Sequence, residues 1–220
     1  FMQRLEAEAT MDEIAINPEL DELLDRQLDQ SKFIAWRDGK TGWPFFDACM
    51  RSLTATGWIN FRMRAMLQSV ASYTLWLPWQ ATGAHLANLF MDYEPGIHWS
   101  QVQMQSGVTG INSVRAYSVG KQSTDHDPNG DFIRRWVPEL GEVPAEHIHQ
   151  PWMMSKAEQE QYNCQIDLDY PAPIVDEKAA RKTGISMSYK AKGDAEVKRR
   201  AKIVFDIHGS RSRQSSRSRK

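Results

Sequence analysis

The chain has 220 residues, of which 41% are hydrophobic and 25% are charged. This length and composition are typical of one globular domain with a buried core, and they exclude low-complexity disorder for most of the chain. No apolar run approaches the ~20 residues of a membrane span, and no basic, apolar leader opens the sequence. The only cysteines, Cys49 and Cys164, are far apart and lack metal-site spacing. We therefore expect a soluble, cytoplasmic protein without a membrane segment, a disulfide or a metal site.

The net charge of −1 conceals an uneven distribution. Residues 190–220 contain eleven Lys/Arg and three Asp/Glu, a balance of +8, so the rest of the chain carries −9. The last stretch, 210–220, is an Arg/Ser run without apolar residues, which predicts a solvated, disordered tail. The alternative for this tail is sequence-independent attraction to nucleic acid phosphates.

The hydrophobic spacing predicts helices along most of the chain. A turn over 39–44 precedes a helix that begins near Pro44 and ends at Gly57. Further helices are predicted over Asp21–Leu28, Trp58–Leu77, Gly83–Met91 and Asp131–Trp136, whereas 101–110 is ambiguous. Several prolines after Gly141 predict irregular structure there. The expected fold class is all-α with a loop-rich C-terminal third.

Motifs between Lys32 and Tyr170 carry a family resemblance over about 140 positions. They include Gly39-Lys40-Thr41-Gly42-Trp43-Pro44, Thr56-Gly57-Trp58-x-Asn60-x-Arg62-x-Arg64, Asp92-Tyr93-Glu94, Asp131-Phe132-Ile133-Arg134-Arg135-Trp136-Val137-Pro138-Glu139-Leu140 and Asp169-Tyr170-Pro171-Ala172-Pro173. In these motifs the chain resembles the C-terminal, helical FAD-binding domain of the DNA photolyase/cryptochrome family.

The resemblance implies FAD as the cofactor and a partial domain. The family's N-terminal antenna domain, its phosphate-holding Thr/Ser segment and its Glu-x-x-Trp-Arg helix would all precede Phe1, so we expect a fragment or a split gene product. We assign residues 1–180 to the partial FAD-binding helical domain and 181–220 to a basic, disordered C-terminal tail. Partners implied are FAD, the missing N-terminal portion and DNA, the last through the tail and the domain surface.

Arg64 and Asp92 are the first candidate site residues. They are 28 residues apart in apolar surroundings, and a buried Arg left without a carboxylate costs about 3–5 kcal/mol. A structural ion pair would explain them without a ligand. The resemblance implies instead that this pair lies against the isoalloxazine ring of FAD, where the positive charge favours the reduced flavin.

The same resemblance suggests further residues around the flavin. Glu94 stands where the family has an Asp near the pyrimidine edge, and the residues matching packing positions are Trp58, Phe61 and Leu86. His98 matches the residue that faces flavin N5, usually Asn in repair enzymes. A neutral His can accept a hydrogen bond there, but it can also become cationic near neutral pH. The alternative is an exposed loop His beside Trp99.

The family reduces its excited flavin by electron hopping along three Trp residues. One matches Trp79, but Val102 and Arg26 stand at the other two positions, so the usual chain is interrupted. Trp99 is the nearest substitute, with Trp76 and Tyr117 as others, although a Trp is more often part of a core. We assign Trp79 and Trp99 to electron transfer.

The lesion pocket departs from the family pattern. Phe61, Ala65 and Met104 replace an Asn, a Met and a Trp of the repair enzymes, so the polar and stacking contacts to a flipped dimer are lost. The expected function is a blue-light flavoprotein domain with electron transfer from reduced FAD, acting as a deoxyribodipyrimidine photo-lyase-like enzyme if it is catalytic. The alternatives are a cryptochrome-like photoreceptor or interaction module, and a flavin-free remnant of the fold.

Overall fold

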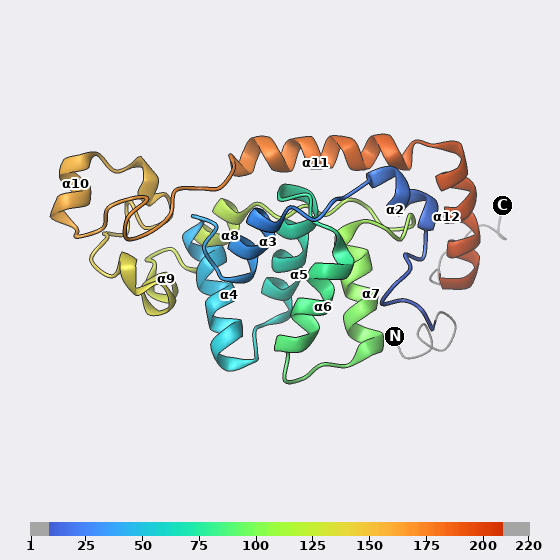
Figure 1. Ribbon diagram of the computed structural model, residues 1–220, viewed down its shortest axis with the longest axis horizontal. Coiled ribbons are helices and arrows are strands. Elements are labelled where there is room, and N and C mark those ends of the chain that lie inside the picture. Colours follow the sequence, from blue (N-terminus) through green and yellow to red (C-terminus); the bar gives the residue numbers. More distant parts are fainter. Residues whose placement is uncertain (1–8, 209–220) are drawn as a thin grey trace, which may run out of the picture.

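The computed structural model describes residues 9–208, which form helices joined by loops (Figure 1). The only β pairing within this range is an isolated bridge between Ile166 and Tyr170, so the predicted all-α class is confirmed. The elements are α2 Pro18–Leu24, α3 Gln30–Arg37, α4 Pro44–Thr56, α5 Phe61–Ser69, the π-helix η1 Val70–Thr74, α6 Trp79–Leu89, α7 Pro95–Ser106, α8 Val119–His126, α9 Asp131–Trp136, the 3₁₀-helices η2 Pro138–Leu140 and η3 Pro151–Met153, α10 Lys156–Gln161, α11 Glu177–Lys192 and α12 Ala195–His208.

Local sequence signals set the ends of α4 and α5. Pro44 occupies the first turn of α4, and Gly57 caps its end with a φ of 69°. The Asn60 side chain accepts from the backbone N–H three residues on and so caps α5. The predicted helix over Trp58–Leu77 therefore begins three residues later, at Phe61, and its last part is the π-helix η1.

Two other predicted elements have different bounds. The helix expected over Asp21–Leu28 is α2, which ends at Leu24 because Asp25 adopts the left-handed conformation with a φ of 44°. The ambiguous segment 101–110 contributes the C-terminal half of α7, which Gly107 terminates with a φ of 74°. His98 consequently lies on a helix and not in a loop.

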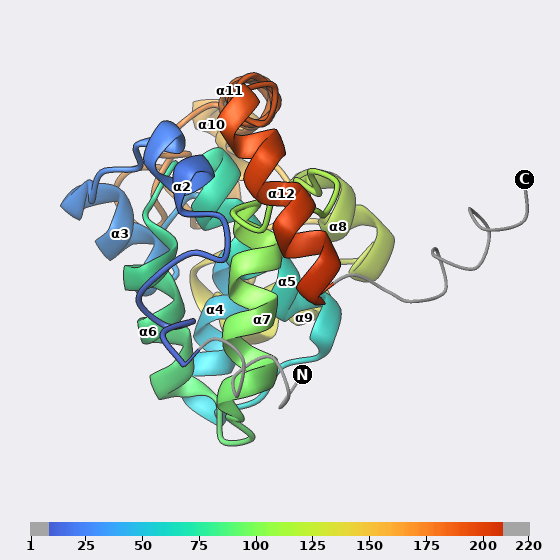
Figure 2. The same ribbon diagram turned by 90° about the vertical axis from the view of Figure 1, so that its right-hand side faces the viewer.

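The helices bury two apolar clusters. The first lies around α4, α5 and α9 and includes Phe46, Leu53 and Met66, all fully buried. The second joins α2, α6, α7 and the C-terminal helices. In Figure 2, α7 stands between α6 and α12, and α5 packs against both α6 and α7. Within residues 9–208, no helix combines the length and hydropathy that a bilayer span requires.

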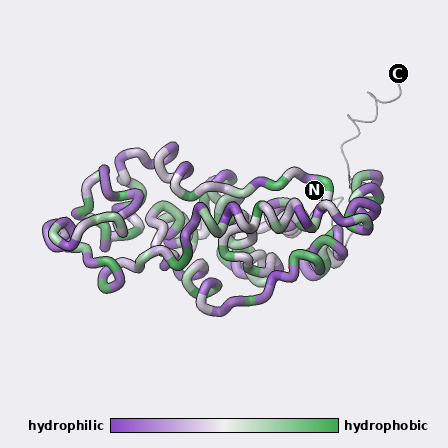
Figure 3. The backbone as a smooth tube through the Cα atoms, turned by 90° about the horizontal axis from the view of Figure 1, so that it is seen from above, coloured by the Kyte–Doolittle hydropathy of each residue, from purple (hydrophilic) through white to green (hydrophobic). Residues whose placement is uncertain are grey.

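The C-terminal segment differs most from the expectation. Residues 181–208 were expected to be disordered, but they are helical, and α11 lies along the top of the molecule across η1 (Figure 1). The buried face of α11 consists of Gly184, Ser188 and Ala191. These small residues give no hydrophobic signal, and along α11 hydrophilic and hydrophobic positions are interspersed without a continuous apolar run (Figure 3). The Arg/Ser run over 210–220 lies outside the described residues.

Gly184 lets α11 approach the π-helix, and we expect Gly184→Ala to destabilise the protein. A Cβ at this position would meet the backbone oxygen of Tyr73 at 2.0 Å. Backbone cannot move aside as a flexible side chain can, so the free energy of unfolding should fall by about 1–3 kcal/mol in urea titrations. Gly120→Ala is the matched control, because a Cβ there meets nothing within 4 Å. Equal stability of the two variants would contradict this packing.

Candidate functional site

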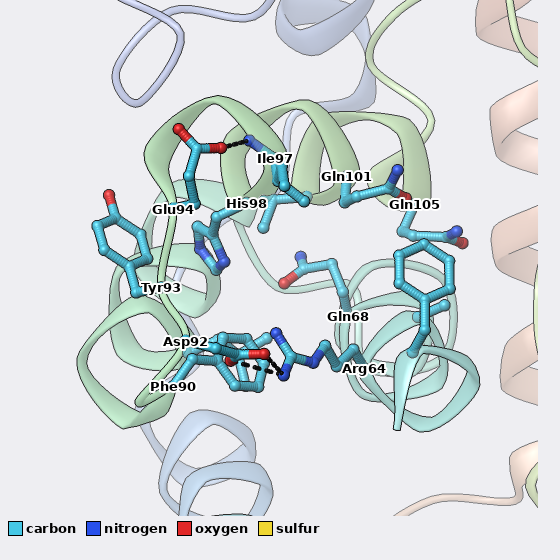
Figure 4. A pocket seen from close by; sticks show the side chains of 14 residues that line it. Arg64, Gln68, Phe90, Asp92, Tyr93, Glu94, Ile97, His98, Gln101 and Gln105 are labelled. Carbon is cyan, nitrogen blue, oxygen red and sulfur yellow. Dashed lines mark hydrogen bonds and ion pairs between the residues drawn. The ribbon is translucent and has the colours of Figure 1, made fainter. Parts of the chain in front are cut away.

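A pocket opens between α5 and α7 (Figure 4). It encloses about 530 Å³ of empty space, part of which is open to solvent. One wall is the face of α5 that carries Phe61, Arg64, Ala65 and Gln68, and the other is the facing side of α7. Leu86 of α6 and residues 90–94 of the α6–α7 link close one end.

Arg64 and Asp92 meet at this pocket as an ion pair. Arg64 Nη2 donates to both carboxylate oxygens of Asp92, at 2.7 and 2.6 Å, and Arg64 Nε donates to the Ile59 carbonyl at 3.0 Å. The guanidinium also lies 4.1 Å from the centre of the Phe90 ring. The apolar surroundings in the sequence suggest a buried pair. The Asp92 side chain is nevertheless 53% exposed. Among the described residues, Nη1 of Arg64 has no hydrogen-bond partner and remains available to a ligand.

Glu94 is the N-cap of α7. Its carboxylate accepts from the backbone N–H groups of Gly96 at 3.2 Å and Ile97 at 2.7 Å, as the dashed line in Figure 4 marks for the second of these. A carboxylate is favourable there because the first N–H groups of a helix lack partners within the helix. Glu94 therefore fixes the start of the helix that supplies one wall of the pocket.

His98 lines the pocket as a buried, neutral side chain. It is 8% exposed, and its ring lies 4.9 to 5.8 Å from the ring centres of Trp99, Tyr93 and Phe90. Burial lowers its pKa to about 4, with a smaller contribution from the Arg64 charge, against the opposing effect of a hydrogen bond to Gly83. His98 is therefore not an exposed loop residue but lines the pocket. Its side chain is uncharged near neutral pH.

The hydrogen bond to Gly83 also sets the tautomer of His98. Its Nε2 lies 2.9 Å from the Gly83 carbonyl oxygen. A carbonyl can only accept, so in the neutral ring Nε2 carries the proton and Nδ1 is left as an acceptor. No hydrogen bond to Nδ1 is present within the described part of the chain.

Three glutamines place unpaired acceptors at the same pocket. The side-chain oxygens of Gln68, Gln101 and Gln105 are buried and have no hydrogen-bond donor among the described residues. Gln101 and Gln105 project from α7 and Gln68 from the opposite side (Figure 4). Buried amide oxygens without a donor are unfavourable, so the pocket favours a ligand that donates hydrogen bonds.

A hydroxyl network fixes the orientation of the Gln68 amide. Its Nε2 lies 2.9 Å from Thr82 Oγ1 and 3.0 Å from Ser106 Oγ. The Ser106 hydroxyl donates to the Val102 carbonyl at 2.7 Å and Thr82 donates to backbone carbonyls of α6. Both hydroxyls can therefore accept from Nε2, which leaves the oxygen of Gln68 without a donor.

Six of the seven predicted cofactor-binding residues line this pocket: Phe61, Arg64, Leu86, Asp92, Glu94 and His98. The seventh, Trp58, does not line this pocket, and its contact with the cofactor stays a prediction. Trp58 lies in the link between α4 and α5, is 57% exposed and lines a separate groove. Gly57 redirects the chain before α5 begins, so Trp58 does not share the face of α5 that carries Arg64. Val102 lines the pocket, but Met104 does not.

The two tryptophans assigned to electron transfer are neighbours. Trp79 is fully buried, and its ring centre lies 6.1 Å from that of Trp99. Trp99 Nε1 donates to the Tyr93 hydroxyl at 3.1 Å, and Tyr93 lines the pocket. Trp79 Nε1 donates to Asp21 at 3.0 Å. Aromatic side chains therefore connect the pocket wall to the second apolar cluster.

The sequence analysis missed several pocket residues that helical spacing could have found. Gln68 follows Arg64 by one turn on α5, and Gln101 and Gln105 continue the stripe that His98 begins on α7. The glutamines of α7 could not be assigned to a helix face from the sequence, because residues 101–110 show no clear helical pattern. Phe90 and Tyr93 join the site through the path of the α6–α7 link, and Ile97 joins it from the first turn of α7.

Comparisons with known proteins agree with this geometry. Residues 1–190 match the family model of the FAD binding domain of DNA photolyase. A deoxyribodipyrimidine photo-lyase of Alkalihalophilus pseudofirmus is 36% identical over 76% of this chain and 35% of its own length. A cryptochrome DASH of Synechocystis is 36% identical over 68% of this chain and 31% of its own. The chain thus spans about a third of the length of these relatives.

Solved structures show the same fold. A bacterial class III photolyase from Agrobacterium tumefaciens aligns with a TM-score of 0.78 and 27% identity, over 86% of this chain and 40% of that one. The predicted helical fold is therefore confirmed in its family-specific form. The chain belongs to the photolyase/cryptochrome family and carries its FAD-binding domain.

Proposed function

We propose that the pocket between α5 and α7 holds the isoalloxazine ring of FAD and that the protein works as a blue-light flavoprotein. A bound flavin absorbs blue light and exchanges single electrons. The observation that carries the proposal is the set of buried amide oxygens without a donor that Gln68, Gln101 and Gln105 place in one pocket, beside the Arg64 guanidinium. The flavin pyrimidine edge offers an N–H that can donate to one of these oxygens and carbonyl groups that can accept from Arg64.

His98 supports the same assignment. A neutral ring with Nε2–H bonded to Gly83 keeps Nδ1 as an acceptor, and an acceptor is what an N–H of a reduced ring requires. Arg64 adds a fixed positive charge at the wall, and the aromatic side chains of Phe90 and Tyr93 exclude water from part of it. The resemblance places the family's phosphate-holding segment before Phe1, so other segments would hold the rest of FAD.

The test is retention of FAD after reconstitution and gel filtration. We expect Arg64→Ala to abolish retention, because the variant loses both the free Nη1 donor and the partner of Asp92. Arg62→Ala is the matched control, since Arg62 is exposed on the same helix outside the pocket. The protein tested carries the upstream portion expected to hold the phosphates. Unchanged flavin stoichiometry in Arg64→Ala would exclude this pocket, and an extended wild-type protein that retains no flavin would favour a flavin-free remnant.

The aromatic neighbours of the pocket lead to a prediction about electron supply. Val102 offers no oxidisable ring at the pocket wall, whereas Trp99 contacts His98 and bonds to Tyr93. We expect Trp99→Phe to slow light-driven flavin reduction more than Trp79→Phe does, and Val102→Trp to accelerate it. Bleaching of the visible flavin absorbance under blue light measures all three rates. A severe loss confined to Trp79→Phe would mean that electrons reach the pocket without Trp99.

The second candidate function is that of a photoreceptor, and the residues at the lesion-binding positions favour it. Phe61 and Ala65 line the pocket where the resemblance gives an amide and a longer side chain in repair enzymes, so these two positions supply no hydrogen bond to the edge of a flipped base. Illumination of the flavin-loaded protein with DNA that carries a cyclobutane dimer separates the candidates. Restored dimer-free DNA supports repair, and flavin photoreduction without repair supports the photoreceptor.

The basic residues near the C-terminus support a DNA-contact role. The Arg residues of 210–220 can attract phosphates without reading sequence. The exposed Lys178, Lys182 and Lys190 of α11 extend this positive character onto the helical domain.

A further inference from the structure

The link between α2 and α3 contains a buried arginine (Figure 1). Asp25 ends α2 in the left-handed conformation, with a φ of 44°. Asp25 and Gln27 are exposed, whereas Arg26 between them is only 8% exposed. Arginine side chains are almost never fully buried unless they are paired, so the surroundings of Arg26 require an explanation.

Two aromatic rings cover the guanidinium of Arg26. Its Cζ lies 4.7 Å from the centre of the Trp76 ring and 5.8 Å from that of Tyr73. Burial lowers the pKa of Arg26 to about 10, against the opposing effects of Tyr73 and Asp21, so the group is a cation at neutral pH. Aromatic faces attract a cation, but they do not supply the oxygen acceptors that a guanidinium requires.

All three guanidinium nitrogens of Arg26 lack a hydrogen-bond partner. Nε, Nη1 and Nη2 are buried and form no hydrogen bond with the described part of the protein. A buried charged donor without an acceptor is strongly unfavourable. The planar fork of nitrogens matches the two oxygens of a carboxylate. Arg26 therefore favours a ligand that brings a carboxylate.

A cavity adjoins Arg26. We call it the Arg26 pocket, and it is lined by Arg26, Pro18, Pro78, Gln80 and four carboxylates, among others. It encloses about 870 Å³ of empty space, part of which is open solvent. It shares no lining residue with the pocket between α5 and α7, so the two are separate sites.

The four carboxylates give the Arg26 pocket an acidic rim. They are those of Glu13, Asp21, Glu22 and Asp25. Asp21 accepts only from the neutral Trp79 Nε1 at 3.0 Å and Gln80 Nε2 at 3.2 Å. None of the four forms a salt bridge with a residue of the described range. Such a rim repels a dianion such as phosphate and attracts a cation.

We propose that the Arg26 pocket binds a basic amino acid, with its carboxylate on the Arg26 guanidinium and its ammonium groups at the acidic rim. The carboxylate supplies the acceptor that Arg26 lacks, and the rim selects against ligands with a net negative charge. Residues 25–29 have no regular secondary structure, so a shift of this link can open the buried guanidinium to the ligand. The C-terminal residue of a basic peptide has the same chemistry, and the experiment distinguishes the two sources.

The test compares lysine with lysine amide by isothermal titration calorimetry at low salt, on the protein without added flavin. Lysine amide keeps both amino groups and lacks the carboxylate, so it should bind the wild-type protein at least about tenfold more weakly. Arg26→Gln should weaken lysine binding by about tenfold and remove the difference between the two ligands. A purely structural role of Arg26 would leave that difference unchanged.

Asp25→Asn tests the acidic rim. Asparagine tolerates the left-handed conformation of Asp25, but the variant loses one negative charge. Lysine binding should weaken by about twofold to fivefold at low salt, and the loss should shrink as the salt concentration increases. Glu160→Gln is the matched control, because Glu160 is exposed on α10 and does not line the pocket.

Nα-acetyl-lysine represents the C-terminal residue of a peptide. Binding equal to that of lysine would assign the site to peptide C-termini, and weaker binding would assign it to the free amino acid. The proposal is overturned if the wild-type protein binds no lysine at millimolar concentration, if lysine amide binds as tightly as lysine, or if Arg26→Gln still distinguishes the two. Because flavin is absent throughout, none of these results depends on the flavin assignment.

Discussion

Replacing Asp47 with alanine should lower the free energy of unfolding by about 4 kcal/mol. The Asp47 side chain is fully buried on α4. It accepts hydrogen bonds from the Thr41 N–H at 2.9 Å, the Thr41 hydroxyl at 2.6 Å, the Gly42 N–H at 3.1 Å and the Tyr170 hydroxyl at 2.5 Å. Alanine would leave these donors buried without acceptors, and it would release both the 39–44 turn and the loop around Tyr170 from the helix.

Urea titration followed by far-UV circular dichroism measures this loss. Tyr170→Phe removes one of the four donors and should cost less than half as much, while Asp131→Ala, at a side chain that is 83% exposed, should change stability by about 0.5 kcal/mol or less. If Asp47→Ala were as stable as Asp131→Ala, the turn and the loop would be held by other contacts.

Acid should destabilise the protein through His98 between about pH 6.5 and pH 4. The pKa of His98 is about 4 in the folded state against 6.5 for an exposed His. As the pH falls through this window, the unfolded chain binds a proton that the folded chain does not, so folding loses up to about 3 kcal/mol. His98→Asn removes the titrating group and should abolish this part of the acid sensitivity.

The titration of Asp47 changes the stability with pH in the opposite direction to that of His98, over an overlapping pH range. Burial raises its pKa to about 6, despite the hydrogen bonds from Thr41 and Tyr170 and the charge of Arg51. A carboxyl with a raised folded-state pKa stabilises below the unfolded value of about 3.8 and loses that contribution as the pH rises through about 6. The two dependences partly cancel in the wild-type protein.

Single variants should separate the two effects. In Asp47→Ala, stability measured at several pH values between about 4 and 7 should decrease more steeply with falling pH than in the wild type. In His98→Asn it should decrease less steeply than in the wild type, because Asp47 then opposes only groups such as His85, whose pKa is also lowered by burial. An acid sensitivity of His98→Asn equal to that of the wild type would show that other groups cause it.

Features that depend on local chemistry can be predicted from the sequence. Pro44, Gly57 and Asn60 act within one helical turn of their own position, so the limits of α4 and the start of α5 are encoded where they occur. The family motifs lie in the same segments, and they were sufficient to identify the fold and six of the residues that line the pocket.

The contacts between distant segments become visible only in the folded protein. The docking of α11 depends on small residues such as Gly184, whose role is the absence of a side chain next to the Tyr73 backbone. The uncharged state of His98 depends on the aromatic rings and the Gly83 carbonyl that surround it after folding. The direction of the chain after Gly57 places Trp58 in a separate groove and not at the pocket between α5 and α7. Burial, close approach and charge environment are properties of neighbours in space, and a linear pattern contains no information on those distances.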